Sequence, residues 1–308
     1  MSPTPAAIEV DVEGRALKLS NLDKVLYPEA GFTKGEVIDY YTRIAPALLP
    51  HLRRRALTLK RYPNGIDGQF FYEKNCPKHR PPWVETLAVW SARNKADVNY
   101  CLIDELAGLV WVANLASLEL HTSLAAASDV QRPTMVVFDL DPGPPATVVE
   151  CGRVALWLRE VLDGLGLQSF PKTSGSKGLQ LYVPLNTPVT YNETKPFAHA
   201  LGRRMEQEHP AEALSVMKKE LRTGKVFIDW SQNDDSKTTV CVYSLRARPR
   251  PTVSTPVTWE EVERTVECGD PDSLVFEAAD VLRRVAADGD LFAPLCELEQ
   301  SLPSQPIG

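Results

Sequence analysis

The sequence predicts an α+β fold whose central sheet is of the split-βαβ type. Three observations predict this class. A buried apolar strand at 134–140 is followed by an amphipathic helix, and two further strands follow at 167–173 and 179–185. A second helix at about 193–208 and a strand at 225–230 complete the order strand–helix–strand–strand–helix–strand, which is typical of that sheet.

The N-terminal part is predicted to be rich in strands, with one early helix. Strands are expected at residues 9–19 and 56–75, and residues 21–28 form a short element that ends at its proline. Thr33 and Glu36 form a capping box, which predicts a helix that runs to about Leu49.

Residues 104–121 are apolar on nearly all sides, and this pattern predicts one buried helix. Its polar residues Asn114, Ser117 and His121 fall on one stripe at helical spacing. Two interpretations are open. The stripe either makes internal hydrogen bonds, which is the commoner case, or points His121 into a cleft.

The core strand at 134–140 leads into a helix with clear end signals. Thr147 and Glu150 form the capping box that begins it, and Gly164 and Gly166 end it. We expect a single domain with three parts: an N-terminal module at about 1–125, a catalytic core at about 126–255, and an acidic, helical and peripheral segment at about 256–308.

The distribution of charge is more informative than the net charge of −6. Residues from Pro256 onward include 12 acidic and 3 basic side chains, so residues 1–255 carry a net charge of +3. A basic cluster lies at residues 51–55, with Lys60 and Arg61 close behind. It is either a solvated surface or a nucleic-acid surface, and the second interpretation is favoured by nearby rings that can stack on bases: Tyr62, Phe70, Phe71 and Tyr72.

Cysteine usage and apolar patterning indicate the compartment. The six cysteines show no paired spacing, so we expect free thiols rather than a disulfide framework. Cys76 and His79 are spaced as half of a zinc site, but no second pair of ligands follows. No apolar stretch is long enough to cross a bilayer, and the first residues lack the pattern of a signal peptide. We therefore expect a cytoplasmic protein with no membrane partner.

Asp139 and Asp141 are the first candidate site residues. They lie two apart on a strand, so both side chains leave the same face, while Phe138 and Leu140 point the other way. Adjacent carboxylates repel each other, and a divalent cation such as Mg²⁺ or Mn²⁺ relieves the repulsion. Two solvated acids in a turn are the structural alternative.

A glycine-rich segment and a third carboxylate complete the pattern. Residues 173–178 read Thr-Ser-Gly-Ser-Lys-Gly, in which hydroxyl groups, N–H groups and Lys177 suit an anion, although a flexible hairpin turn fits as well. Asp229 lies in an apolar strand and needs a partner, either a shared metal or a salt bridge. With Arg222 and Arg246, these groups predict metal-dependent phosphoryl or nucleotidyl transfer.

Three motifs resemble those of the polymerase domain of bacterial ligase D, which belongs to the archaeo-eukaryotic primase superfamily: Phe138-Asp-Leu-Asp-Pro142, Thr173-Ser-Gly-Ser-Lys-Gly-Leu179 and Val226-Phe-Ile-Asp-Trp-Ser-Gln232. Shorter strings that begin at Asn21, Lys60 and Tyr243 are similar to further signatures, and the similarity covers nearly the whole chain. It implies a primase-type core, with an RRM-like sheet and helices, packed against an N-terminal β-rich module. The chain is then a stand-alone homologue or an excised domain.

The resemblance also implies an activity and its partners. It implies a polymerase that fills gaps and extends 3′ ends at DNA breaks in non-homologous end joining, on the nucleoid of a bacterium. Such an enzyme uses two Mn²⁺ or Mg²⁺ ions and favours ribonucleoside over deoxynucleoside triphosphates. It acts as a monomer on ends and gaps with a 5′-phosphate, and Ku and a DNA ligase are its candidate partners.

Residue roles follow from the matching motifs. Asp139, Asp141 and Asp229 would be the metal ligands. The nucleotide would be bound by Lys60 and His121 near the sugar, and by Ser174, Gly175, Lys177, Gln180, Arg222, Gln232 and Arg246. Lys24 and Lys34 would bind the 5′-phosphate across a gap, and Phe71 and Tyr72 would stack near the templating base.

Two positions depart from the family pattern. Gln180 stands where the family usually has histidine, and glutamine cannot become cationic, so triphosphate affinity is expected to be lower. Tyr72 replaces phenylalanine and keeps the stacking face. Two rival functions are an unrelated D-x-D nucleotide-sugar transferase, which would not need Lys24 and Lys34, and a non-catalytic module that bridges DNA ends, which would not need Asp229.

Overall fold

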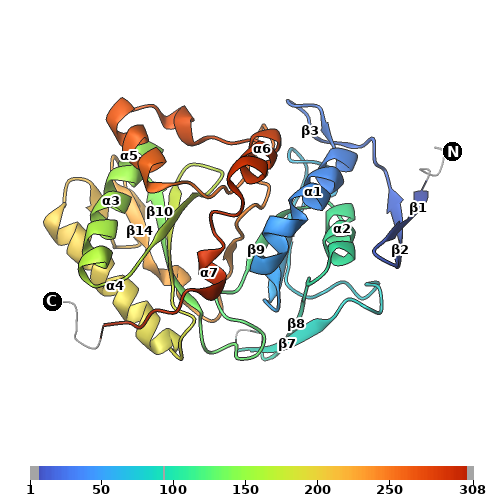
Figure 1. The fold of residues 1–308 in the computed structure, drawn as a ribbon, viewed down its shortest axis with the longest axis horizontal. Helices are drawn as coiled ribbons and strands as arrows, with labels where there is room; N and C mark the ends of the chain where they lie inside the picture. The colour runs from blue at the N-terminus through green and yellow to red at the C-terminus, as the bar shows by residue number, and fades with distance from the viewer. Residues whose placement is uncertain (1–6, 93, 304–308) are drawn as a thin grey trace.

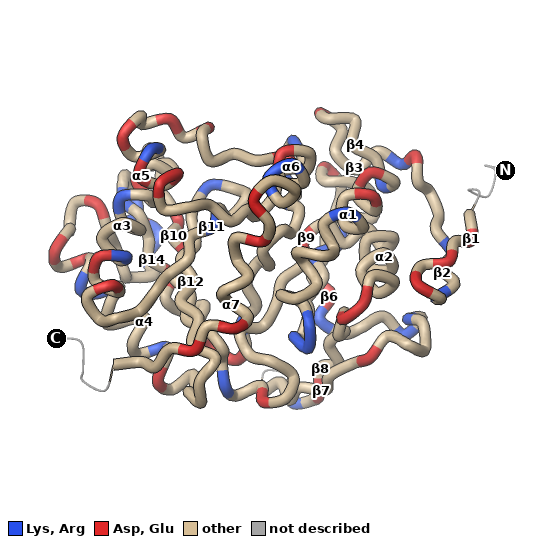
Figure 2. The backbone as a smooth tube through the Cα atoms, in the orientation of Figure 1, with Lys and Arg blue, Asp and Glu red and all other residues tan. Residues whose placement is uncertain are grey.

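The computed structural model describes residues 7–92 and 94–303. Figure 1 shows two halves side by side, with the N-terminal half around α1 (Lys34–Leu52) and the other half around α3 (Val148–Gly164) and α4 (Tyr191–Glu208). Lys, Arg, Asp and Glu are interleaved along the backbone of both halves (Figure 2).

The second half contains the predicted split-βαβ sheet. Its strands are β10 (Met135–Pro142), β11 (Phe170–Thr173), β12 (Leu179–Pro184), β13 (Ala213–Leu214) and β14 (Val226–Asp229). They lie in the order β11-β12-β10-β14-β13, and every pair is antiparallel except β13 with β14. Helices α3 and α4 follow β10 and β12 in the chain and pack on the sheet (Figure 1). The predicted fold class is therefore confirmed.

The N-terminal half is the β-rich module. Its elements are the hairpin β1 (Ala7–Val12) and β2 (Arg15–Ser20), the pair β3 (Val25–Tyr27) and β4 (Phe32–Thr33), helices α1 and α2 (Leu106–Asn114), and a sheet of β5 (Leu57–Arg61), β6 (Phe71–Glu73), β7 (Thr86–Ser91), β8 (Ala96–Cys101), β9 (Ser117–Thr122) and β15 (Thr239–Val240). The capping boxes predicted at Thr33 and Thr147 both form.

The prediction of one helix over 104–121 is wrong. Helix α2 ends at Asn114, because Ala116 adopts a left-handed conformation with φ 57°, and Ser117–Thr122 is strand β9. Leu118 and Leu120 alternate with polar residues there, and this period of two is a strand signal. The stripe of Asn114, Ser117 and His121 therefore does not exist as a helical face.

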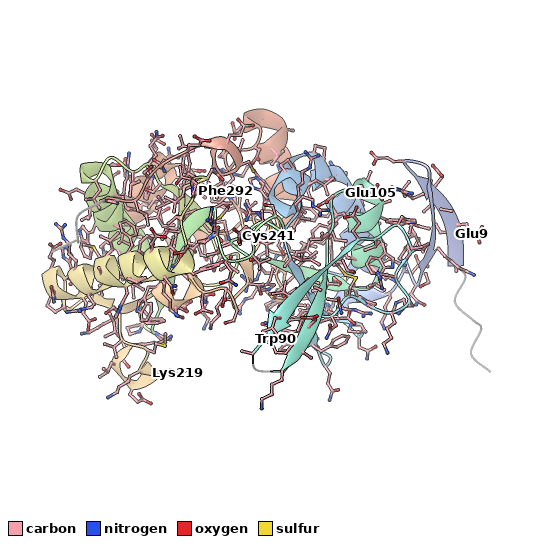
Figure 3. The ribbon with its side chains drawn as sticks, turned by 90° about the horizontal axis from the view of Figure 1, so that it is seen from below. Glu9, Trp90, Glu105, Lys219, Cys241 and Phe292 are labelled. Carbon is pink, nitrogen blue, oxygen red and sulfur yellow. A yellow bond between two sulfur atoms is a disulfide. The ribbon has the colours of Figure 1, made fainter. Side chains whose placement is uncertain are left out.

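The C-terminal segment is helical, as predicted, but it is not peripheral. It forms α5 (Trp259–Cys268), α6 (Ala278–Asp288) and α7 (Pro294–Glu297). Phe292 is 1% exposed and packs in the core of the N-terminal half, and Figure 3 shows it with Cys241 in the interior of the molecule. Three short 3-10 turns lie at Lys219–Leu221, Trp230–Gln232 and Pro271–Leu274.

The expectation of free thiols rather than disulfides is wrong for one pair of cysteines. Cys76 and Cys101 form a disulfide, which fixes the segment after β6 to the end of β8 and excludes a zinc site at Cys76. Two arginines of the basic cluster at 51–55 have partners within the protein. Arg54 pairs with Glu85 on the surface, and the half-buried Arg55 donates to Leu124 O at 2.8 Å, so a nucleic-acid role for this cluster stays a prediction.

Strand β10 contributes side chains to the cores of both halves. Val136, Phe138 and Leu140 pack under α3 and α4, whereas Met135 and Val137 pack into the core of the N-terminal half. Because side chains alternate along a strand, Asp139 and Asp141 continue the face that meets the N-terminal half. Within the described residues, no helix is long and apolar enough to cross a membrane.

An ion pair joins α1 to the C-terminal segment and generates a testable prediction. His51 Nε2 lies 2.8 Å from Asp290 Oδ2, and both side chains are largely buried. Burial lowers the pKa of His51, but hydrogen bonds with Asp290 and Cys296 outweigh it and raise the pKa from 6.5 to about 9. The pair therefore stabilises the fold fully below about pH 6.5, and this contribution is lost as the pH rises through about 9.

We expect His51→Gln to lower the free energy of unfolding by about 2–3 kcal/mol at about pH 6 and by much less at about pH 9.5. Denaturant titrations of both proteins at the two pH values measure this difference. An equal loss at both pH values would show that the charge of His51 does not contribute.

Candidate active site

Three carboxylates meet on one face of the core sheet. The side chains of Asp139 and Asp141 leave β10 on the same side, and Asp139 lies directly opposite Asp229 on the neighbouring strand β14. Burial raises the pKa of Asp139 from 3.8 to about 7, and the neighbouring Asp141 and Asp229 add to this effect. Burial and Asp229 also raise the pKa of Asp141. The fold therefore concentrates negative charge here, and the nearby Gln180, Lys172, Arg222 and Arg246 relieve its repulsion only in part.

The Asp229 carboxylate is occupied by the turn that follows it. Its Oδ1 accepts from Ser231 N at 2.9 Å and Ser231 Oγ at 2.6 Å, and its Oδ2 accepts from Gln232 Nε2 at 3.0 Å. As the side chains stand, no three His, Cys, Asp or Glu residues among those described form a group that could hold a metal ion. Gln232 thus holds Asp229 in this arrangement.

A cavity of about 320 Å³ lies over the carboxylates Asp139 and Asp141. The N-terminal half contributes Tyr72 and His121 to its wall, and the core contributes further predicted residues: Ser174, Lys177, Gln180, Gln232 and Arg246. Four other predicted metal-binding or nucleotide-binding residues are not among the described residues that line the cavity: Lys60, Gly175, Arg222 and Asp229. The site is therefore built between the two halves, and acids and cations line the same cavity.

The loop between β11 and β12 is held in shape by its own side chains. Ser174 Oγ accepts from Ser176 N at 3.2 Å and from Gly178 N at 3.1 Å. Gly175 has φ 66°, and a Cβ there would lie 2.6 Å from the backbone of Val253. A Cβ on Gly178 would lie 2.1 Å from Leu140 O. These glycines are required by contacts within the protein, so the loop is a rigid structure rather than a flexible turn.

Arg246 connects this loop to the N-terminal half. Its Nη1 donates to Ser174 O, and its Nε lies 3.4 Å from Glu119 Oε2 in an ion pair without hydrogen-bond geometry. Glu119 also lies 3.2 Å from Lys60 Nζ and 3.0 Å from His121 Nε2. Sequence reasoning missed Glu119, although the alternation of polar and apolar residues along 117–122 could have placed it on the face of His121.

Aromatic rings surround Lys60 beside the cavity. Its Nζ lies 4.7 Å from the ring centre of Phe70 and 5.5 Å from that of Tyr72. Both rings are exposed, at 51% and 57%. Phe71, which sequence reasoning paired with Tyr72, lies over Arg61 instead and is not among the residues that line the cavity. The exposed aromatic pair next to the cavity is therefore Phe70 and Tyr72.

Lys24 and Lys34 lie close together, outside the lining of the cavity. Lys24 Nζ donates to Asn64 Oδ1 at 3.0 Å, and Lys34 Nζ donates to Ser20 O at 2.6 Å. Burial, together with the charges of Lys24 and Arg61, lowers the pKa of Lys34 from 10.5 to about 8. Arg61 is paired with Glu73 at 2.7 Å, whereas the printed contacts of Lys24 and Lys34 are with an amide and a backbone carbonyl. These two lysines are therefore a suitable site for an anion.

Gln180 and Arg222 have partners that the sequence did not indicate. Gln180 lies opposite Asp139 on β12, and its Oε1 accepts from the buried Lys172 at 2.6 Å. Burial lowers the pKa of Lys172 from 10.5 to about 7. The Arg222 guanidinium lies 3.8 Å from the ring centre of Phe227, and its charge lowers the pKa of Asp141. Lys172 therefore orients the amide of Gln180.

Comparison with known proteins identifies relatives of the chain. The family model of the LigD primase-polymerase domain matches residues 33–292. The multifunctional non-homologous end joining DNA repair protein LigD of Mycobacterium tuberculosis is 43% identical over 285 residues, which cover 90% of this chain and 36% of that protein. The bifunctional non-homologous end joining protein LigD of Bacillus subtilis is 31% identical over 292 residues, which cover 94% of this chain and 46% of that protein.

A solved structure is similar over nearly its full length. The polymerase domain of Mycobacterium tuberculosis ligase D, in complex with DNA, matches with a TM-score of 0.85 and 40% sequence identity. The match covers 92% of this chain and 99% of that one. The chain therefore spans less than half the length of the two LigD proteins, at 36% and 46%, but corresponds to one solved domain of the first.

The repulsion among the carboxylates generates a prediction about stability. A carboxyl group whose pKa is raised by folding destabilises the protein above that pKa, near pH 7 for Asp139, and has no effect well below 3.8. We expect Asp139→Asn to raise the free energy of unfolding by about 1–3 kcal/mol at about pH 8, without metal, and to have little effect near about pH 3.5.

Denaturant titrations in the presence of a chelator measure the change, with Asp97→Asn on the exposed face of β8 as the matched control. Loss of stability in Asp139→Asn at about pH 8 would contradict the repulsion inferred from the geometry.

Proposed function

The chain belongs to the LigD primase-polymerase family, and we propose that it is a nucleotidyltransferase that extends 3′ ends and fills gaps at DNA breaks. The observation that carries the proposal is the cavity between the halves, which is lined by Asp139 and Asp141 together with Lys177 and Arg246. Nucleotidyl transfer requires this combination, because a triphosphate must be held by cations while its reacting phosphorus lies next to the catalytic metals.

Metal dependence is part of the proposal. Oxygen donors suit Mn²⁺ and Mg²⁺, and the mutual repulsion of Asp139 and Asp141 is relieved by a divalent cation. Asp139 and Asp141 would hold two such ions, with Asp229 joining after its carboxylate turns away from Ser231. The bound ions would lower the pKa of the attacking hydroxyl group and neutralise charge on the phosphates.

The cations and the loop would hold the nucleotide. Lys177, Arg246 and Ser174 lie in the wall beside the acids, where they would contact the triphosphate together with the backbone of Gly175. Arg222 would contribute charge from behind Asp141. Gln180 would donate its amide N–H groups, because Lys172 already occupies its oxygen. Lys60 and His121 would lie at the sugar, where a preference for ribonucleotides would be set.

The DNA would lie on the N-terminal half. Lys24 and Lys34 would bind the 5′-phosphate at the far side of a gap, since they form a cationic site away from the cavity. Tyr72 would stack near the templating base with Phe70 beside it, and Phe71 would lie farther out on Arg61. The similar structure of the Mycobacterium tuberculosis domain is a complex with DNA, which supports DNA as a ligand of this chain.

The wider cellular role is proposed from the relatives. Both LigD relatives are named for non-homologous end joining, so we propose that this protein acts at breaks on the bacterial nucleoid, in the cytoplasm. It would act as a monomer, and Ku and a DNA ligase are the partners that this role implies.

The decisive experiment measures extension of a primer on a gapped duplex with a 5′-phosphate. We expect extension with Mn²⁺ and weaker extension with Mg²⁺, with ribonucleoside triphosphates used more efficiently than deoxynucleoside triphosphates. Absence of extension with every nucleotide and either metal, together with normal binding of the gapped DNA, would favour the non-catalytic bridging module instead.

Removal of the two cavity carboxylates separates catalysis from DNA binding. We expect Asp139→Ala combined with Asp141→Ala to abolish nucleotide addition and to leave the affinity for 5′-phosphorylated gaps nearly unchanged, because the phosphate site lies elsewhere. Gel-based extension and fluorescence anisotropy measure the two properties. Metal-dependent extension that persists in the double variant would remove the basis of the assignment.

Lys24→Ala tests the phosphate site. Loss of one charge-assisted contact is expected to weaken binding to a 5′-phosphorylated gap about tenfold and to leave binding to an unphosphorylated gap nearly unchanged. Lys195→Ala on α4, in the other half, is the matched control. An equal loss on both kinds of DNA would indicate a general electrostatic effect instead.

A further inference from the structure

Glu119 lies behind the wall of the candidate nucleotide site, in contact with Lys60, His121 and Arg246, and the proposed function gives it no role. It is 2% exposed on β9, and each of its carboxylate oxygens faces a different set of donors. Oε1 lies 3.2 Å from both Lys60 Nζ and Ala247 N, and 3.5 Å from the hydroxyl of Tyr62. These contacts join β5, β9 and the segment that follows Arg246.

The second oxygen of Glu119 faces His121. Oε2 lies 3.0 Å from His121 Nε2 and 3.4 Å from Arg246 Nε. Although burial alone would raise the pKa of Glu119, the hydrogen bond from His121 and the charge of Arg246 hold it well below its usual range. Glu119 is therefore an ionised carboxylate, which can only accept a hydrogen bond.

This contact fixes the tautomer of His121. Because Oε2 can only accept, the proton of the imidazole must be on Nε2. Burial lowers the pKa of His121, and Arg246 and Lys60 lower it further although Glu119 opposes them, so the ring is neutral near pH 7. Nδ1 then carries a lone pair. No described residue forms a hydrogen bond with Nδ1, and the ring lines the cavity beside Tyr72.

We propose that Glu119 is the positioning residue that holds His121 as a hydrogen-bond acceptor for the 2′-hydroxyl of an incoming ribonucleotide. A ribose 2′-hydroxyl donates a proton to Nδ1, whereas a deoxyribose has nothing to donate and leaves Nδ1 without a partner. The inference rests on the proposed function, because it assumes that a nucleotide enters this cavity. It assigns the choice of sugar to a carboxylate that itself touches no substrate.

Glu119→Gln reverses the polarity of His121 without removing volume. Three donors surround Oε1, so the amide oxygen of glutamine is expected to take that position, with its NH₂ group facing His121. The imidazole must then accept at Nε2 and carry its proton on Nδ1. Nδ1 becomes a donor toward the cavity, so it can no longer accept a hydrogen bond from the 2′-hydroxyl.

The test compares ATP with dATP on the full chain. We expect Glu119→Gln to lower the ratio of kcat/KM for ATP over dATP about tenfold, mainly through the KM for ATP, as for the loss of one hydrogen bond. His121→Phe should lower the ratio similarly, and the double variant should lower it no further, since both changes remove one interaction.

Asp290→Asn is the matched control. It also removes a buried carboxylate that hydrogen-bonds a histidine, His51, but Asp290 lies outside the cavity lining. We expect this variant to be less stable than the unchanged protein and to have the same ratio of kcat/KM for ATP over dATP. If Glu119→Gln lowers kcat/KM for ATP and dATP equally, Glu119 has only a structural role and the proposal is overturned.

Binding separates this inference from the proposed function. Calorimetric titration with ATP and with dATP, in Ca²⁺ and without DNA, needs no catalysis. If the unchanged protein binds ATP more tightly than dATP and Glu119→Gln abolishes this difference, the result supports the inference even if the protein extends no primer. Equal affinities of the unchanged protein for ATP and dATP would overturn it even if primers were extended. Glu119→Ala, measured in the same way, replaces Glu119→Gln if the latter does not fold.

Discussion

The direct pairing of β10 with β14 is the constraint on which the candidate site depends. It places Asp139 opposite Asp229, and the alternation of side chains along β10 adds Asp141 to the same face. The same face carries Met135 and Val137 nearer the start of the strand, and these residues pack into the N-terminal half. One strand therefore both joins the halves and turns the carboxylates toward the cavity between them.

The cationic part of the candidate site depends on charges that are buried and paired. Arg246 contacts the loop at Ser174 and lies beside Glu119, which in turn holds Lys60 and His121. A buried carboxylate among cations is stable only while its partners remain in place, so these side chains have little freedom. Such preorganisation suits a site that must hold a flexible triphosphate and a sugar in one position.

Local signals in the sequence were sufficient for most of the fold and for the metal half of the site. Capping boxes at Thr33 and Thr147 and the order of strands and helices around 134–230 depend on neighbouring residues alone, so they were predicted and are confirmed. Asp139 and Asp141 share a face because a strand has a period of two, which needs no knowledge of the tertiary structure. Asp229 was singled out by its place in an apolar strand, where a carboxylate needs a partner, and the family motifs then assigned it the same role.

Only the tertiary structure decided which polar residues act together. Glu119 was missed because 104–121 has the composition of a buried helix, and the left-handed turn at Ala116 that converts its end into a strand is stabilised by pairing with β5. The disulfide of Cys76 with Cys101 and the burial of Phe292 likewise join segments far apart in the chain. The sequence by itself determined the sheet and its acids, because those follow from local periodicity, whereas the cationic part of the candidate site required contacts that only folding creates.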